Sequence, residues 1–179
     1  AAGEVEQGIL DLEALSASDP NAREPDMALI ATYMRGRNFD KALAAADALI
    51  KKQPQSSAAH NAKGAVYAAT GDLKNARQSF EKALALDPNS VDAAYNFATL
   101  EATEGNTADA KKRLEQILAK DSKSERALLG LAQLQIISNA PAADVAAAIE
   151  RAIVANPTST QSRLALITHL ARQKEWKAA

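Results

Sequence analysis

Small and apolar residues recur along this chain at helical spacing, in a pattern that returns every 34 residues. The best-formed copy spans residues 57–90 and reads SAAHNAKGAVYAATGDLKNARQSFEKALALDPNS. Small residues and aromatic rings hold fixed places in it, and a proline closes it: Gly64, Tyr67, Ala76, Phe80, Ala83 and Pro88. This spacing predicts two antiparallel helices of about 13–15 residues in each copy, and each helix is then roughly 20 Å long.

Each copy of the pattern ends where a proline stops a helix. Proline lacks the backbone donor of an ongoing helix and disfavours the helical conformation of the residue before it. The proline and the residue before it are Asp19-Pro20, Gln53-Pro54, Asp87-Pro88 and Asn156-Pro157. The first three prolines lie 34 residues apart, and the last lies 69 residues beyond Pro88. Where a further proline is due, Ser122 stands in a polar stretch that we expect to turn the chain equally well.

The pattern of these six residues in 57–90 resembles the tetratricopeptide repeat, which has small residues, aromatic residues and a final proline at the same positions. The resemblance implies an all-α fold, a right-handed superhelical solenoid of antiparallel helix pairs.

The repeat spacing also predicts the bounds of each repeat. Complete repeats are expected at 23–56, 57–90, 91–124 and 125–159. The last has one extra residue in its Ser138–Pro141 turn, where Asn139 tolerates a left-handed backbone. Residues 4–22 match a second helix alone, and residues 160–179 match a first helix and the start of a second near Trp176. Both ends therefore cut a repeat, as in a piece of a longer array.

Small residues are expected where the two helices of a pair cross. On the first helices these are Gly64, Ala98 and Ala132, and on the second helices they are Ala42, Ala76 and Ala110. Low bulk permits a close approach of the helix axes. A leucine at Gly64 or Ala76 is therefore expected to overpack the crossing, at a cost of ~1–3 kcal/mol.

In proteins with similar repeats, the first helices line a concave groove, and this resemblance indicates a candidate partner-binding surface. The residues at the corresponding places, called here the groove set, are Asn61, Tyr95, Asn96, Thr99, Leu129, Gln133 and Ile136, with Met27 and Met34 nearer the start. Their neutral mixture of polar and apolar groups suits an extended peptide. The alternative is that Tyr95, Leu129 and Ile136 only pack against the neighbouring pair. A carboxylate clamp is not expected, because Lys63 and Arg126 lack the rest of that pattern, and a regular Asn ladder is absent.

Composition and charge exclude several kinds of site and partner. Among 179 residues there are 42 Ala, which favours helices, and no Cys, which excludes disulfides and thiolate-ligated metals. Lys and Arg number 21 against 22 Asp and Glu, and the basic stretch Lys111–Arg113 lies among acidic residues, so we expect a solvated face and no nucleic-acid partner. His60 and His169 lie over three repeats apart, so we do not expect them to share a metal ion or a catalytic role. Ser79 and Lys82 have the Ser-x-x-Lys spacing of some acyl-enzymes, and we interpret this match as chance. No catalytic residue, metal or cofactor is expected.

Two functions follow from these observations. The first is a non-catalytic scaffold that binds a protein or peptide. The second is a structural spacer of a larger envelope assembly whose functional site lies elsewhere. No segment is expected to insert in a membrane, and the cut repeat ends could allow self-association.

A narrower resemblance concerns residues 138–179. This stretch, SNAPAADVAAAIERAIVANPTSTQSRLALITHLARQKEWKAA, is similar to phrases in bacterial tetratricopeptide lipoproteins of PEP-CTERM/exosortase and exopolysaccharide systems. The resemblance implies an exported, membrane-anchored lipoprotein that faces the periplasm and acts in protein sorting or polysaccharide assembly. The alternative location is the cytoplasm.

Overall fold

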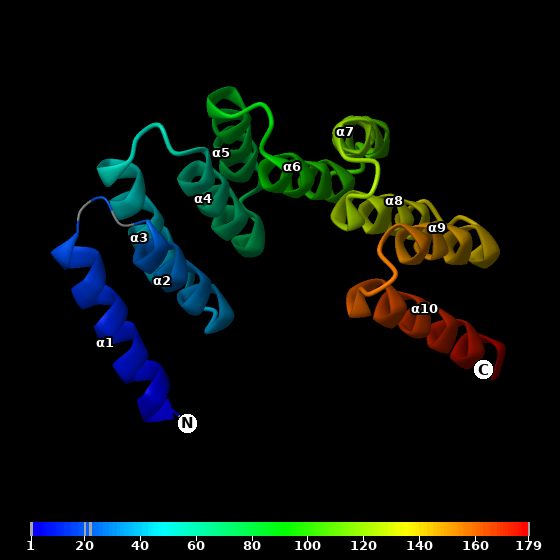
Figure 1. Cartoon of the computed structure of the whole chain (residues 1–179), viewed down its shortest axis with the longest axis horizontal. Coiled ribbons are helices and arrows are strands. Elements are labelled where there is room, and N and C mark those ends of the chain that lie inside the picture. The colour runs from blue at the N-terminus through cyan, green and yellow to red at the C-terminus, as the bar shows by residue number, and fades with distance from the viewer. Residues whose placement is uncertain (1, 20, 22, 179) are drawn as a thin grey trace. The chain divides into compact units, whose positions relative to one another are not determined.

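Every regular element in the described part of the chain is an α-helix. The computed structural model describes residues 2–19, 21 and 23–178, so Pro20, predicted to end the first helix, lies outside the described residues. The helices within these ranges, shown in Figure 1, are α1 (Ala2–Ser18), α2 (Glu24–Arg35), α3 (Phe39–Lys52), α4 (Ser57–Thr70), α5 (Leu73–Leu86), α6 (Val91–Thr103), α7 (Thr107–Lys120), α8 (Glu125–Ile137), α9 (Ala142–Ala155) and α10 (Thr160–Ala178). The expected all-α fold class is confirmed.

Most helices follow one another as pairs joined by short turns. The structure places two helices in each of the segments 23–56, 57–90, 91–124 and 125–159, while α1 and α10 stand before and after these pairs. The chain folds as two compact units, Ala1–Asn96 and Phe97–Ala179, with the boundary inside α6. Within the first unit α2 packs on α3 and α4 on α5, and within the second α8 packs on α9.

The turn inside a pair is set by residues that accept a left-handed backbone and by a side chain that caps the next helix. After α4, Gly71 has a φ of 81°, and the Asp72 carboxylate accepts a hydrogen bond of 3.1 Å from the Asn75 backbone N–H. Both features are typical of a helix end followed at once by a helix start. In the longer turn before α9, Asn139 has a φ of 53°, as its residue type predicts.

The turns between pairs keep one backbone conformation whether or not a proline is present. The last residues before the turns, Gln53, Asp87, Asp121 and Asn156, have φ between −138° and −132°. Asp121 shares this geometry although Ser122 stands in the place of the proline. The prediction that Ser122 permits the same turn is confirmed.

The crossing of α4 and α5 depends on the absence of a side chain at Gly64. An added Cβ at this position would lie 2.6 Å from Cε1 of the Phe80 ring, and Phe80 is itself buried. The small residues predicted at the helix crossings are all buried: Gly64, Ala98, Ala132, Ala42, Ala76 and Ala110. These residues leave room for the larger side chains that fill the core of each pair.

The end of the chain differs from the prediction. Helix α10 continues without a break from Thr160 to Ala178, so no second helix begins near Trp176. In the complete pairs, the residue at the corresponding place has a positive φ and the first helix ends there: Arg37, Gly71, Gly105 and Asn139. Here Gln173 is followed by Lys and Glu, which are good helix formers, and nothing stops the helix.

The close crossing predicts opposite effects for the same change at two glycines. Gly64→Ala should lower the free energy of unfolding by ~1–2 kcal/mol, because the new methyl group must displace the Phe80 ring. The matched control is Gly8→Ala in α1, where an added Cβ meets nothing within 4 Å. It should raise the free energy of unfolding by about 0.5–1 kcal/mol through helix propensity alone.

Urea unfolding followed by circular dichroism measures both effects. Adding Phe80→Leu to Gly64→Ala should recover part of the loss, which a double-mutant cycle reports as coupling between the two sites. Stabilisation by both alanines would contradict the close contact between Gly64 and Phe80.

Candidate partner-binding site

The groove set lies on first helices of the pairs and is divided between the two units. Asn61 is on α4, and Tyr95 and Asn96 are on the part of α6 that belongs to the first unit. In the second unit, Thr99 is on α6, and Leu129, Gln133 and Ile136 are on α8.

In the first unit the structure brings together two asparagines of the groove set. The Asn96 side-chain amide donates a hydrogen bond of 3.0 Å to Oδ1 of Asn61, and both residues are half-buried. They come from consecutive first helices, 35 residues apart in the chain. This bond uses one donor of Asn96 and one acceptor of Asn61. The Asn61 side-chain amino group and the Asn96 side-chain carbonyl oxygen take no part in it.

Lys63, two residues after Asn61 on α4, is held by an ion pair. Its Nζ lies 2.6 Å from Oδ1 of Asp47 and 5.6 Å from the centroid of the Tyr67 ring. The hydrogen bond to Asp47 raises the pKa of Lys63, partly opposed by burial. A lysine already bonded to a carboxylate is poorly placed to clamp a second one, in agreement with the absence of a clamp motif.

Several members of the predicted surface also contribute to packing. Leu129 is half-buried and packs against the core cluster of its own helix pair, which includes Ala132, Val145 and Ile149. Ile136 is 37% exposed, and Gln133 and Thr99 are exposed. Tyr95 is half-buried. Met27 and Met34 lie against the core of the first unit.

An ion pair in the second unit was missed by the sequence reasoning. Arg113 was assigned to a solvated basic stretch, but it is half-buried and makes two hydrogen bonds to the buried Glu101, of 2.6 and 3.0 Å. The guanidinium carbon also lies 4.0 Å from the centroid of the Phe97 ring. The assignment is therefore wrong for Arg113 and holds for Lys111 and Lys112, which are exposed. The sequence contained a signal of this ion pair, because Glu101 occupies the repeat position that holds the aromatic Tyr67 in residues 57–90.

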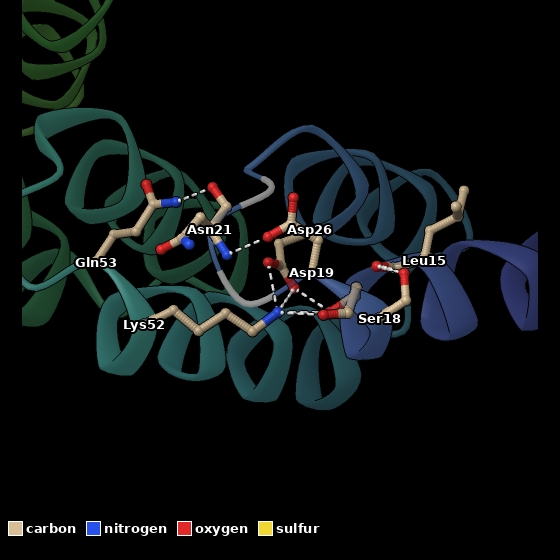
Figure 2. A network of polar contacts seen from close by, with 8 residues as sticks. Leu15, Ser18, Asp19, Asn21, Asp26, Lys52 and Gln53 are labelled. Atoms are coloured by element: carbon tan, nitrogen blue, oxygen red, sulfur yellow. Dashed lines mark hydrogen bonds and ion pairs between the residues drawn. The ribbon is translucent and has the colours of Figure 1, made fainter.

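A second polar network joins α1, α2 and α3 in the first unit. Figure 2 shows Lys52 reaching to Asp26, with Nζ 2.9 Å from Oδ2, and Asp26 is buried. Lys52 also donates to the Ser16 hydroxyl at 2.7 Å, and Gln53 donates to the Asn21 carbonyl oxygen at 2.8 Å (Figure 2). Because a buried carboxylate is costly without a partner, Lys52 fixes how the three helices meet.

Two cavities lie beside second helices. One, of about 400 Å³, is lined by α1, α2 and α3 around Asp26 and Lys52. The other, of about 420 Å³, is lined by α7, α8 and α9, with Leu128, Leu131 and Leu134 along its apolar wall. Neither of these two cavities is lined by the groove set.

The two histidines interact with backbone oxygens, His169 with Ala142 at 3.0 Å and His60 with Pro54 at 3.2 Å. Among the described residues, no group of three His, Cys, Asp or Glu could hold a metal ion. No helix in the described part of the chain combines the length and apolar character needed to cross a bilayer.

Glu125, the first residue of α8, caps the start of α10. Its carboxylate accepts hydrogen bonds from the Ser159 and Ser162 hydroxyls and one of 3.2 Å from the Ser162 backbone N–H, in the first turn of α10. The bonds from the two hydroxyls lower the pKa of Glu125 below its ordinary value of 4.5, against the opposing effect of burial. A negative charge at a helix start is favoured by the helix dipole.

Comparison with known proteins identifies the repeat. The family model of the tetratricopeptide repeat matches residues 27–91 and 95–160. None of the curated protein sequences matches the chain significantly.

Solved structures with similar folds have low sequence identity to the chain. A thermophilic tetratricopeptide repeat protein from Thermus thermophilus superposes with a TM-score of 0.80 at 18% identity, covering 95% of this chain and 92% of that one. A tetratricopeptide repeat protein from Parabacteroides merdae gives 0.79 at 19% identity, covering 97% and 68%. PilW, a type IV pilus biogenesis factor, gives 0.73 at 19% identity, covering 95% and 80%. At these identities the likeness concerns the fold.

The lowered pKa of Glu125 predicts a pH dependence of stability. The folded-state pKa lies below the ordinary value, so the stabilisation is present above pH 4.5 and is lost as the pH falls through the folded-state pKa. Glu125→Gln should cost about 1 kcal/mol at neutral pH and flatten the stability curve below pH 4.5. Glu150→Gln, at an exposed position of α9, is the matched control and should leave the curve unchanged. Urea unfolding over a pH series measures the difference, and parallel curves for Glu125→Gln and the wild type would contradict the capping role.

Proposed function

The chain belongs to the tetratricopeptide repeat family, and on that premise we propose that it is a non-catalytic scaffold whose first helices bind a peptide or protein segment. Tetratricopeptide repeat proteins generally bind proteins or peptides and are generally not enzymes.

The observation that carries the proposal is the bond between Asn61 and Asn96. It holds two amides of neighbouring first helices in one orientation, and leaves a donor on Asn61 and an acceptor on Asn96 outside the bond. An extended peptide backbone presents the complementary acceptor and donor. Because the amides are already ordered, binding costs less side-chain entropy than it would with mobile side chains.

In the first unit, Tyr95 is proposed to contact a side chain of the bound segment, and the groove-set residues of the second unit are proposed as a separate candidate surface of that unit. Ile136 offers exposed apolar surface, and Leu129 adds a half-buried apolar edge to the same helix. Gln133 and Thr99 supply exposed polar groups, and Tyr95 a half-buried ring. The set carries no formal charge, so we propose a segment with neutral and apolar side chains in place of a strongly acidic or basic one.

The finer proposal places this scaffold in PEP-CTERM protein sorting or exopolysaccharide assembly, as an exported lipoprotein. Its support is the phrase at residues 138–179, which resembles that family of lipoproteins.

The scaffold proposal predicts which substitutions weaken peptide binding. Peptides selected by display on the wild-type chain should lose about 3- to 10-fold in affinity with Asn61→Ala or Asn96→Ala, since each removes roughly one hydrogen bond. Gln78→Ala, which removes an exposed amide from the second helix α5, is the matched control and should bind as the wild type does. Fluorescence anisotropy with labelled peptides measures these affinities. Failure to select any peptide, or equal affinity for all variants, would favour the structural spacer.

The finer proposal is tested in the natural host. Metabolic labelling with palmitate should label the natural gene product, and fractionation should place it with the envelope membranes, because lipid chains supply membrane affinity. A soluble, unlabelled product would contradict the lipoprotein assignment and leave the scaffold proposal standing.

A further inference from the structure

The cavity between α7, α8 and α9 is separate from the groove set and lies within the second unit. Its volume is about 420 Å³, within the range of small-molecule sites. Three leucine side chains of α8 form an apolar wall, and the exposed side chains of Lys111, Glu115 and Arg151 add charged groups to the lining. An apolar wall with a few polar groups is typical of a site for a small ligand or a single side chain.

The lining of this cavity includes a buried acceptor without a partner. The side-chain carbonyl oxygen of Gln135 is buried, and it accepts no hydrogen bond from any residue that the structure describes. Gln135 itself lines the cavity. A buried polar atom is costly when it lacks a hydrogen bond, so this oxygen favours a ligand that brings a donor.

The repeat position of Gln135 is satisfied within the chain in two other pairs. In the first complete pair it holds Tyr33, which is buried and donates its hydroxyl to Oε1 of Glu13 at 2.9 Å. In the third pair it holds Glu101, which accepts two hydrogen bonds from Arg113. The fourth pair therefore differs from both, because its residue at this position does not reach a partner.

The cavity keeps the surroundings that Tyr33 has in the first unit. The cavity between α1, α2 and α3 is lined by Tyr33 and Glu13, and the residues at these repeat positions, Gln135 and Glu115, line the cavity between α7, α8 and α9. Further lining residues correspond in the same way: Leu29 with Leu131, and Ala45 with Ala148. The main loss from one site to the other is an aromatic ring that carries a hydroxyl donor.

The filling of the third pair is lost as well. Ala148 holds the repeat position of Arg113, so the fourth pair has a methyl group where the third has a guanidinium. Ala148 lines the cavity. Neither of the large side chains that serve this position elsewhere is supplied by the fourth pair.

We propose that this cavity binds a phenol group, which takes the position that the Tyr33 ring has in the first unit. The ring lies against the leucine wall of α8 and beside Ala148, and its hydroxyl donates to the buried oxygen of Gln135. Glu115, the counterpart of Glu13, supplies a second acceptor. The phenol belongs to a small molecule or to a tyrosine side chain of a bound protein segment, since both offer the same ring and donor. The site does not depend on the groove set, which does not line it.

Titrations followed by two-dimensional NMR test the proposal with matched ligands. p-Cresol should shift backbone amide signals of α7, α8 and α9 around the cavity, with the millimolar affinity expected of so small a ligand. N-acetyl-tyrosinamide and N-acetyl-phenylalaninamide differ only in the hydroxyl, so the tyrosine derivative should bind about 3- to 10-fold more tightly. Binding of p-cresol without the tyrosine derivative would assign the site to small phenols, whereas binding of both would assign it to a tyrosine side chain as well.

Variants test whether binding occurs in the cavity. Gln135→Tyr should place a ring of the chain itself there, as Tyr33 does in the first unit, and weaken p-cresol binding by more than about tenfold. Ala148→Leu narrows the cavity and should have the same effect. Gln116→Tyr, at an exposed position of α7 that does not line the cavity, is the matched control and should bind as the wild type does. Circular dichroism checks that each variant folds.

Three results would overturn the proposal. The first is a wild-type chain whose amide signals around the cavity do not shift with p-cresol. The second is unchanged binding by folded Gln135→Tyr or Ala148→Leu. The third is equal affinity for the tyrosine and phenylalanine derivatives, because the buried oxygen of Gln135 would then have no role in recognition. The first and third results come from the wild-type chain, so they decide the matter even if a variant fails to fold.

Discussion

The structure depends on how closely the two helices of a pair can cross. At the best-defined crossing, the Phe80 ring occupies the space that a side chain at Gly64 would need, and the alanines at the other crossings are fully or almost fully buried. Close-packed interiors do not absorb an extra methyl group cheaply. The small residues therefore set the separation of the helices, and that separation places the first-helix faces from which the candidate surface is built.

Polar groups then determine how one helix meets its neighbours, because a buried charge is tolerated only when it is paired. Asp26 with Lys52 joins α2 to α3 and, through Ser16, to α1. Glu101 with Arg113 joins α6 to α7, and Glu125 caps the start of α10. Unlike apolar contacts, these bonds have fixed directions, so they specify one arrangement among the many that a largely alanine surface would allow.

The candidate surface could be predicted in part. Repeat spacing located Asn61 and Asn96 on first helices, and the structure adds that they bond to each other. The same spacing could not decide between binding and packing for Leu129, which lies against the core of its unit. It also assigned Arg113 to solvent, because a charged residue in a basic run looks exposed until the carboxylate facing it is known.

By itself the sequence determined the all-α fold class, the helix pairs, the small residues at their crossings and the turns at Ser122 and Asn139. These features depend on contacts within about one repeat, and local spacing and backbone preference record them. The tertiary structure decided which polar residues are buried together, which groove-set residues pack, and that α10 runs through to Ala178. Those outcomes depend on which side chains from distant parts of the chain face one another, and on whether a stop signal is strong enough to end a helix in its packed setting.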